Sequence, residues 1–402
     1  MKKFFALVVA LLMTLSVFSV AGAESAFNGE IKIWVADAVV DFTLQQVENF
    51  KAANPQYADM TVVVEAVGEG DAANNMITDV EGGADIYGFA QDQLARLVAA
   101  GALIPLSDAN AAIVSAENDA GSVAAGTMGD LMWAYPITSD NGYFLYYDTS
   151  VVSDPSTIEG ILADCEAAGK NFYFEINSGW YQTAFFFGAG CTLTYDVDNM
   201  GNLVACNVDY ASENGVKALK AMINTAKSPM FVNGSSASNA TNLGALVSGA
   251  WDAVAVQDIL GENYAACKLP TVDGFQLGGF GGFKLMGVKP QTDIAKLDAC
   301  DALALYLTSG DVQAARYDAV QWGPSNLQAQ QMEAIQQNAA LSALADQLQY
   351  CIGQGQYPND YWTLATSLGD NVLADTYDEY TDEQLMDVLV EFQNTASSYI
   401  AQ

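Results

Sequence analysis

Residues 131–148, which read LMWAYPITSDNGYFLYYD, constrain the fold more than any other part of this chain. Leu131 to Ile137 and Tyr143 to Tyr147 are apolar, β-prone runs, and such runs are typical of the buried strands of α/β domains. The insert between them, Thr138 to Gly142, is short and polar. Its side-chain oxygens and its glycine favour a crossing between two bodies rather than a hairpin. A ligand held there would be contacted from both sides.

The same stretch carries a resemblance to a known family. A Tyr-Pro dipeptide, a small polar insert with one carboxylate and an aromatic strand ending in Tyr147-Asp148 resemble the first inter-domain crossover of the family 1 extracellular solute-binding proteins. Within that family the chain is most similar to the maltodextrin-binding proteins of ABC importers, and the similarity rests on the order and spacing of several motifs. It implies an α/β protein of the type II periplasmic-binding-protein-like fold. Such a fold has two lobes, each a mixed sheet flanked by helices, joined by three crossovers.

The N-terminus predicts export. Two lysines precede an apolar stretch from Phe4 to Val20, and Ala21 to Ala23 supplies a small-residue cleavage site, so residues 1–23 have the pattern of a secretory signal peptide. Relatives in single-membrane bacteria keep a lipid-bearing cysteine at the cleavage point, whereas the first cysteine here is Cys165. We therefore expect an exported protein, periplasmic or at the cell surface, without a lipid anchor.

The charge and the missing histidines exclude several function classes. The chain has 14 basic and 48 acidic residues, a formal charge of −34, and such a field repels nucleic acid and anionic membrane surfaces. Half of the residues are hydrophobic, which favours a folded chain whose acidity serves solubility. Without histidine, neither a Ser-His-Asp nor a Cys-His catalytic set can exist, and a zinc site of the usual kind is not expected. We expect neither a metal nor a cofactor.

Two of the six cysteines flank a predicted hairpin. Cys191 and Cys206 enclose the segment TLTYDVDNMGNLVA, and a turn centred between Asp198 and Asn199 would place the two thiols opposite each other. Exported chains permit a disulfide, and the geometry is within reach. The alternative is that all six cysteines are small buried hydrophobic residues.

The first strands of the chain predict where a site begins. Glu30 to Val35 and Met60 to Glu65 read as strands and Phe42 to Ala53 as the helix between them, which implies a parallel sheet with helices on both faces. Ligands of such sheets bind beyond the carboxyl ends of the strands. Asp37, in the loop after the first strand, is therefore a candidate contact, with Asp41 as a second. Either acid can instead be a solvated loop side chain.

A second pattern, ITDVEGGADIYGFAQD at residues 77–92, resembles the N-terminal domain of the family. Glycines end a helix, an aromatic strand enters the sheet, and the end of the strand would deliver Phe89 and Asp92 into the cleft. The resemblance implies a stacking ring at Phe89 and a hydroxyl-binding carboxylate at Asp92. In the alternative interpretation, Phe89 belongs to the core and Asp92 caps the helix from Gln93 to Ala100.

The crossing and the second lobe supply further candidates. Asp140 aligns with the cleft glutamate of the family, and Asn141 beside it is a second polar contact. Trp180 lies between the predicted strand Asn171 to Ile176 and the predicted helix Thr183 to Phe187. The resemblance implies that its ring stacks on the ligand. The alternative is that Trp180 packs under the apolar run that follows it.

The C-terminal segment YPNDYW resembles the loop and helix start that present another stacking tryptophan in the family, so Trp362 and then Tyr361 are candidates. One more tryptophan of the family follows a strand that we expect near Ala253 to Val256. An aliphatic residue, Ile259 or Leu260, falls at that position, which leaves the family's tryptophan without a clear counterpart.

The remaining crossings define the predicted lobes. The glycine-rich run Gly278 to Phe283 lacks the Gly-Lys-Ser/Thr ending of a phosphate loop and resembles the second crossing, and Trp322 to Ser325 resembles the third. The expected boundaries are 24–138 with 286–328 for the N-terminal lobe and 139–285 with 329–402 for the C-terminal lobe.

The combined hypothesis is a monomeric binding protein that captures an oligosaccharide, maltose or a maltodextrin first, and delivers it to the permease subunits of an ABC transporter. Sugars need aromatic platforms and paired polar contacts. Phe89, Trp180 and Trp362 would provide the platforms. Asp92, Asp140 and Asn141 would provide the polar contacts. Alternatives are a binding protein for another sugar, a secreted carbohydrate-active enzyme with paired carboxylates, and a surface adhesion protein. We expect no enzyme, because no acid has the apolar setting that would raise its pKa for general acid catalysis.

Overall fold

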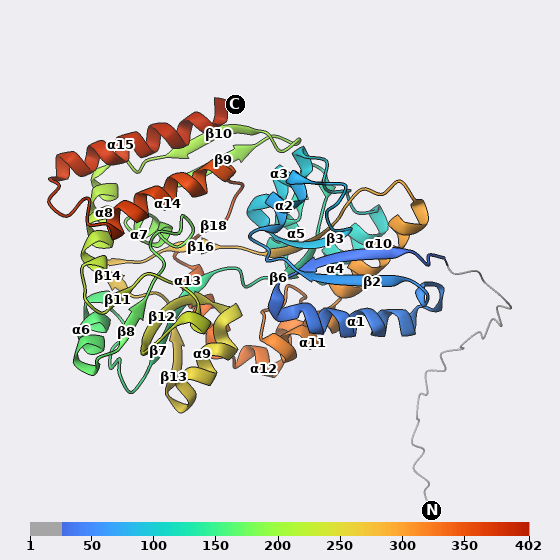
Figure 1. Cartoon of the computed structure of the whole chain (residues 1–402), viewed down its shortest axis with the longest axis horizontal. Coiled ribbons are helices and arrows are strands. Elements are labelled where there is room, and N and C mark those ends of the chain that lie inside the picture. Colours follow the sequence, from blue (N-terminus) through green and yellow to red (C-terminus); the bar gives the residue numbers. More distant parts are fainter. Residues whose placement is uncertain (1–25, 402) are drawn as a thin grey trace, which may run out of the picture.

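The computed structural model describes residues 26–401 and shows two lobes side by side (Figure 1). The predicted signal peptide, residues 1–23, lies outside the described residues. Each lobe is built on one five-stranded mixed sheet with helices around it, so the expected α/β architecture is confirmed. No helix within the described range combines the length and the apolar character needed to cross a bilayer.

The sheet of the N-terminal lobe has the strand order β2-β1-β3-β17-β6. β1 (Glu30–Val35) pairs in parallel with β2 (Thr61–Ala66) and with β3 (Ile86–Ala90), as the predicted β-α-β unit requires. β17 (Lys284–Val288) comes from far along the chain and is antiparallel to both β3 and β6 (Tyr135–Thr138). The carboxyl ends of β1, β2 and β3 therefore meet at one edge of the sheet.

The sheet of the C-terminal lobe has the order β11-β8-β12-β7-β13 and repeats the scheme. β11 (Phe231–Val232), β8 (Asn171–Tyr173) and β12 (Leu243–Gly249) run parallel. β7 (Tyr143–Asp148) lies antiparallel between β12 and β13 (Tyr264–Cys267).

One predicted strand of this lobe is wrong. Residues 253–256 belong to α9 (Ala253–Leu260), and the strand lies about ten residues earlier, in β12. A short apolar run fits a buried helix as well as a buried strand, and here residues 250–252 form a 3-10 turn that leads directly into the helix.

Three crossings join the lobes. Residues 139–142 connect β6 of one sheet to β7 of the other, as the sequence predicts. The backbone N–H of Ser139 donates to the carbonyl of Gly323 over 3.0 Å, and that of Asn141 donates to the carbonyl of Gly282 over 3.2 Å. The three connections therefore lie next to one another. The exact residue boundaries of the lobes stay a prediction.

Helices cover both sheets (Figure 1). The N-terminal lobe carries α1 (Val40–Ala53), α2 (Ala72–Thr78), α3 (Leu94–Ala99), α4 (Asp108–Glu117), α5 (Ala120–Ala125), α10 (Ile294–Leu307) and α11 (Gly310–Val320). Besides α9, the others are α6 (Ile158–Ala168), α7 (Thr183–Gly188), α8 (Glu213–Ala226), α12 (Glu333–Gln336), α13 (Ala339–Leu348), α14 (Asn359–Leu373) and α15 (Asp382–Ser398). Short two-stranded pairs are β4 (Thr127–Met128) with β5 (Leu131–Met132), β9 (Leu193–Val197) with β10 (Leu203–Val208), β14 (Thr271–Val272) with β15 (Phe275–Gln276), and β16 (Gly279–Gly281) with β18 (Cys351–Gly353).

The hairpin of β9 and β10 exists, but its register contradicts the expected disulfide. Cys206 lies opposite Tyr195, not opposite Cys191, and all six cysteines are free. The side chain of Asp198 accepts hydrogen bonds from the backbone N–H groups of Met200 and Asn202, which makes the turn longer than the predicted one. The longer turn and a register shift in β10 move the pairing several residues along the strand.

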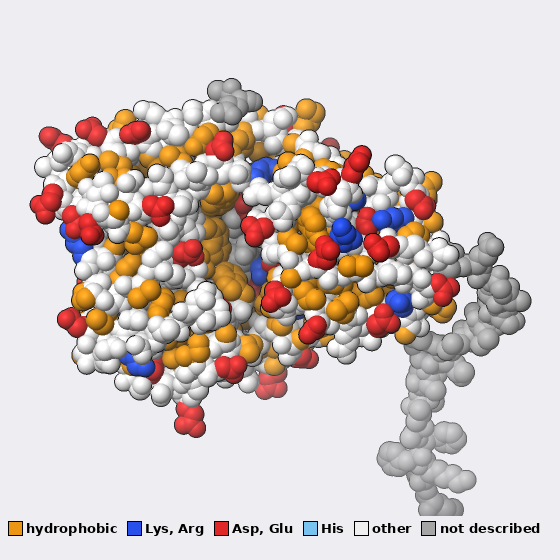
Figure 2. All heavy atoms as spheres, viewed as in Figure 1, with side chains coloured by type: hydrophobic (Ala, Val, Ile, Leu, Met, Phe, Trp, Pro, Cys, Tyr) orange, Lys and Arg blue, Asp and Glu red, His pale blue; other side chains and the backbone are white. Residues whose placement is uncertain are grey.

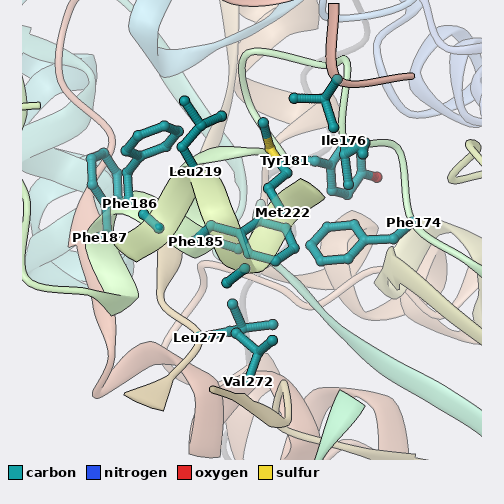
Figure 3. Close-up of a cluster of buried hydrophobic side chains, with 14 of the residues drawn as sticks. Phe174, Ile176, Tyr181, Phe185, Phe186, Phe187, Leu219, Met222, Val272 and Leu277 are labelled. Carbon is teal, nitrogen blue, oxygen red and sulfur yellow. The ribbon is translucent and has the colours of Figure 1, made fainter. Parts of the chain in front are cut away.

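Aromatic residues fill the core of the C-terminal lobe. Phe174, Phe185 and Phe186 are fully buried with Tyr181 close by (Figure 3). The rings of Phe174 and Phe185 stack with centroids 5.4 Å apart, and those of Phe186 and Tyr210 with centroids 4.1 Å apart. Because this core is densely packed, it gives the loops that follow β8 and β12 a rigid base.

Candidate ligand-binding site

A cavity of about 570 Å³ lies between the lobes, where Figure 2 shows a hollow with hydrophobic side chains in it. On the N-terminal side its wall comes from the residues that follow β1, β2 and β3, and on the C-terminal side from those that follow β8, β12 and β18. The first and third crossings contribute Asn141 and Trp322, and the start of β17 contributes Lys284. The cavity therefore lies at the carboxyl ends of the parallel strands, as expected for α/β sheets.

The N-terminal wall is made mostly of small residues. Ala36 and Ala38 follow β1, Gly68 and Gly70 follow β2, and Ala90 ends β3. Polar groups stand among them, and these are Glu69, Asp92 and Gln93. Small side chains leave room for a ligand, while the acids and the amide can hydrogen-bond hydroxyl groups.

Asp92 lines this cavity from the short helical turn after β3, as the sequence predicts. The side chain is only 4 % exposed, and its burial raises the pKa of the carboxyl group to about 7, against the opposing charge of Arg96. The expectation that no acid has a strongly raised pKa is therefore wrong. Near neutral pH the group can both donate and accept hydrogen bonds.

Three tryptophans form the C-terminal wall. Trp180 follows β8, Trp251 follows β12, and Trp362 lies in the first turn of α14, and all three rings are half-buried. The centroids of Trp180 and Trp251 are 5.9 Å apart. Gly179 allows the loop to approach α14, since a Cβ there would lie 2.7 Å from the Cβ of Ala365. The wall thus offers three aromatic rings to the cavity, of which those of Trp180 and Trp251 lie next to each other.

Gln354 holds the ring of Trp180 in place. The indole N–H donates to Oε1 of Gln354 over 3.1 Å, and the edge of the ring meets Tyr143 with centroids 4.6 Å apart. The side chain of Asn141 donates to the same oxygen over 3.4 Å. Trp180 and Asn141, both predicted contacts, are therefore brought to one place by a residue that sequence reasoning did not single out.

Phe89 does not reach the cavity. It is fully buried in the core of the N-terminal lobe. The centroids of its ring and of the Tyr87 ring are 5.8 Å apart. Successive side chains of β3 point to opposite faces of a sheet that is covered on both sides, so an aromatic residue there meets a hydrophobic core. The stacking role predicted for Phe89 is wrong, and the alternative that it belongs to the core is correct.

Tyr361 and Asp37 also lie outside the cavity lining. Tyr361 is fully buried, donates its hydroxyl to the carbonyl of Gly179 over 3.2 Å, and packs against the neighbouring Trp362 with ring centroids 4.9 Å apart. Asp37 is exposed, although the residues on either side of it line the cavity. Both were expected as direct contacts. The backbone turns of α14 and of the 3-10 helix after β1 point adjacent side chains in different directions.

Asp140 has a different place from the one expected. Its Oδ2 accepts a hydrogen bond from the backbone N–H of Gly323 over 2.6 Å, so it joins the first crossing to the third. Burial raises the pKa of its carboxyl group, an effect opposed by Lys284. It lines a second cavity of about 390 Å³ beside Leu341, not the cavity with the tryptophans. The structure thus gives Asp140 a structural role at the crossings.

The sequence did not reveal Trp251, Trp322 or Lys284 as site residues. Trp251 was missed because the preceding strand was placed at 253–256; it follows the buried run LGALVSG, the same signal that found Trp180. Lys284 is buried at the start of β17, with its Nζ 3.7 Å from the ring centroid of Trp322 and 5.3 Å from that of Trp251. A single lysine in an apolar strand gives no sequence signal of its own.

Within residues 26–401, no three side chains of the metal-binding types gather at one place. The cavity instead joins apolar rings to a few hydrogen-bonding groups, which suits an organic ligand with apolar faces and a polar rim. Two lobes, three crossings and such a cavity between the lobes define a protein that holds its ligand between two domains.

The chain belongs to the bacterial extracellular solute-binding protein family, whose model matches residues 45–343. This confirms the resemblance inferred from the sequence. No curated protein sequence matches the chain.

Solved structures confirm the fold. The maltodextrin-binding protein MalE1 of L. casei BL23, solved without ligand, has a TM-score of 0.74 at 22 % identity, over 94 % of this chain and all of that protein. The GacH receptor of Streptomyces glaucescens, solved unliganded and with acarbose, has a TM-score of 0.75 at 16 % identity, over 92 % and 99 % of the two chains. A structure with acarbose reaches 0.79 at 24 % identity, over 92 % and 98 %.

Proposed function

We propose that this protein is the extracytoplasmic substrate-binding protein of a carbohydrate ABC transporter. It holds an oligosaccharide in the cavity between its lobes and delivers it to the permease. Maltose or a maltodextrin is the first candidate for this ligand. The observation that carries this proposal is the arrangement of Trp180, Trp251 and Trp362 on one wall, opposite Asp92 and Gln93 on the other. Sugar rings have apolar C–H faces and a rim of hydroxyl groups, so they match such a pair of walls.

The energetics suit reversible capture. If each of three rings removes roughly 80 Å² of apolar surface from water, each contributes about 2 kcal/mol at 25 cal/mol/Å² before ordering costs. Three rings would give about 6 kcal/mol before these costs, so hydrogen bonds at the rim have to offset the costs and supply the rest of the 8 kcal/mol of a micromolar complex. Such an affinity allows both capture outside the cell and release to a transporter.

Closure of the lobes couples binding to a shape that a permease can recognise. The three adjacent crossings form a hinge, and a ligand that contacts both walls favours the closed arrangement. The protein works as an exported monomer, because its family is extracellular and its cavity is completed by one chain. The signal peptide over residues 1–23 is part of this proposal.

Solved relatives support maltodextrins as the first ligands to test. One of them is named a maltodextrin-binding protein and another was solved with acarbose. Another oligosaccharide is the alternative, because Asp140 and Phe89 do not line the cavity as the resemblance to maltodextrin binders implies.

Calorimetry with maltotriose, cellobiose, xylobiose and galactobiose tests the proposal. We expect one of these sugars to bind, and Trp251→Ala combined with Trp362→Ala to abolish the binding. Trp133→Phe, at a tryptophan outside the cavity, should leave it unchanged. Unchanged affinity in the double variant would mean that the site is elsewhere, and no binding of any sugar by the wild type would overturn the proposal.

A second function deserves a test because of Asp92. The cavity contains a buried carboxyl group with a pKa of about 7 and a second acid, Glu69, and glycoside hydrolysis needs an acid and a second carboxylate. Overnight incubation with maltoheptaose should leave the sugar intact. Shortened products, lost in Asp92→Asn, would favour the enzyme.

A further inference from the structure

We propose that Lys284 is a specificity-determining residue that donates hydrogen bonds to an uncharged oxygen, a hydroxyl or ring oxygen, of the bound sugar. This inference rests on the proposed function and deepens it. It assigns a role to a residue that the sequence did not single out, and it restricts the ligand class to sugars that are neutral at this position.

The position of the ammonium group carries the first step. Among the described residues that line the cavity, Lys284 is the only lysine or arginine. It is 6 % exposed, and its Nζ lies over the ring of Trp322 and near that of Trp251. Trp322 belongs to the third crossing and Trp251 to the C-terminal wall. The group therefore lies where the hinge meets the aromatic wall.

The second step concerns the hydrogen-bonding capacity of this group. An ammonium has three N–H donors, which water can meet in the open cavity and which need other acceptors once a ligand displaces that water. Within residues 26–401 no carboxylate lies within 4.0 Å of Nζ, and Nζ donates no hydrogen bond to a protein acceptor. The π faces attract the charge but do not replace oxygen acceptors. A ligand in the cavity can supply them.

The third step concerns the charge of the ligand. Asp140 is close enough for the Lys284 ammonium to oppose the rise of the Asp140 pKa, so the ammonium favours the ionised form of that carboxyl group. The same cavity contains Glu69 and Asp92. A carboxylate on the sugar would be repelled by Glu69, and by Asp92 in its ionised form, whereas a hydroxyl or ring oxygen accepts from the ammonium without repulsion. Charge complementarity therefore favours a neutral sugar.

Calorimetry on matched variants tests the role of the residue. The probe is the sugar of the four named above that binds the wild type most tightly. Lys284→Met should raise the Kd for this sugar about tenfold or more. The Kd of Lys284→Arg should lie between those of the wild type and Lys284→Met. Lys217 is the control, because its Nζ lies 4.7 Å from the ring centroid of Phe275 outside the cavity. Lys217→Met should keep the wild-type Kd, and an unchanged Kd in Lys284→Met overturns the inference.

Lysine methylation of the wild-type protein gives a second test that does not depend on how a variant folds. Saturation with the same sugar should slow dimethylation of Lys284, measured by mass spectrometry, and leave Lys217 unaffected. Equal rates with and without sugar overturn the role of Lys284. Tighter binding of trigalacturonate than of the neutral sugars overturns the neutral ligand class. If the wild type binds no sugar at all, the proposed function fails. If the wild type binds a sugar and Lys284→Met binds it equally well, only the inference about Lys284 fails.

Discussion

The indole N–H of Trp180 donates a hydrogen bond to the side-chain oxygen of Gln354 over 3.1 Å. The backbone carbonyl of Gln354 accepts from the side chain of Gln91 in the N-terminal lobe, and its backbone N–H donates to Gly281 over 2.9 Å. Two residues further on, Gln356 accepts from the backbone N–H of Ala95 over 2.9 Å. The segment after β18 therefore joins both lobes at the cavity and orients one of its aromatic rings.

Replacement of Gln354 by alanine should weaken ligand binding. The change leaves the Trp180 N–H and the Asn141 amide without their shared acceptor, which costs about 1–3 kcal/mol, or roughly 5- to 150-fold in Kd if the penalty falls on the closed, liganded state. Calorimetry measures the Kd. The control is Gln349→Ala, an exposed glutamine bonded to the carbonyl of Asp346. Equal affinity in the two variants would show that Trp180 needs no such support.

Phe89→Ala should lower stability and not act through ligand contacts. Truncation of this fully buried ring leaves a cavity in the core of the N-terminal lobe, at a cost of about 3–5 kcal/mol. Urea unfolding should show this loss, while the Kd measured well below the unfolding transition stays near the wild-type value. Trp251→Ala should show the reverse pattern. A folded Phe89→Ala protein that no longer binds the sugar would show that Phe89 takes part in ligand binding.

Asp92 should make stability depend on pH. Burial raises its pKa in the folded protein to about 7 from an ordinary value of 3.8, so the folded state holds the extra proton between these values. Protonation of Asp92 therefore contributes fully to the free energy of unfolding below pH 3.8. This contribution is lost as the pH rises through 7. Asp92→Asn cannot ionise, so its stability relative to the wild type should rise by up to about 4 kcal/mol between pH 4 and pH 8.

Urea unfolding at a series of pH values measures this difference. Asp37→Asn, at an exposed acid near the cavity, should show no such trend. A constant difference between Asp92→Asn and the wild type over this range would mean that the carboxyl group is hydrated in the folded protein.

All six cysteines should be free thiols. Alkylation in denaturant without reductant should label six residues, because Cys206 pairs across the hairpin with Tyr195 and not with Cys191. In the native protein the reaction should be slow, since burial raises the pKa of the Cys191 thiol to about 11 and also raises that of Cys206. Mass spectrometry counts the labels, and a pair that resists alkylation until reduction would reveal a disulfide.

Much of the molecule was predictable from local patterns. The two apolar runs around residues 138–142 predicted strands of different sheets, and the structure places β6 in one lobe and β7 in the other. Asp92, Asn141, Trp180 and Trp362 were found from their places beside predicted elements together with the resemblance to the family, and all four line the cavity. Polar or aromatic residues directly after a buried strand are a local signal, and a parallel sheet brings such positions together at one edge.

The sequence by itself determined the export signal pattern, the absence of histidine chemistry, the alternation of strands and helices and the likeness to a solute-binding family. Only the tertiary structure decided which aromatic rings are free for a ligand: it buried Phe89 and Tyr361 in the cores and brought Trp251 and Lys284 to the cavity. The physical reason is that hydrophobicity sends a ring out of water without specifying where. Whether its neighbours form a core or one wall of a cleft depends on segments hundreds of residues apart in the chain.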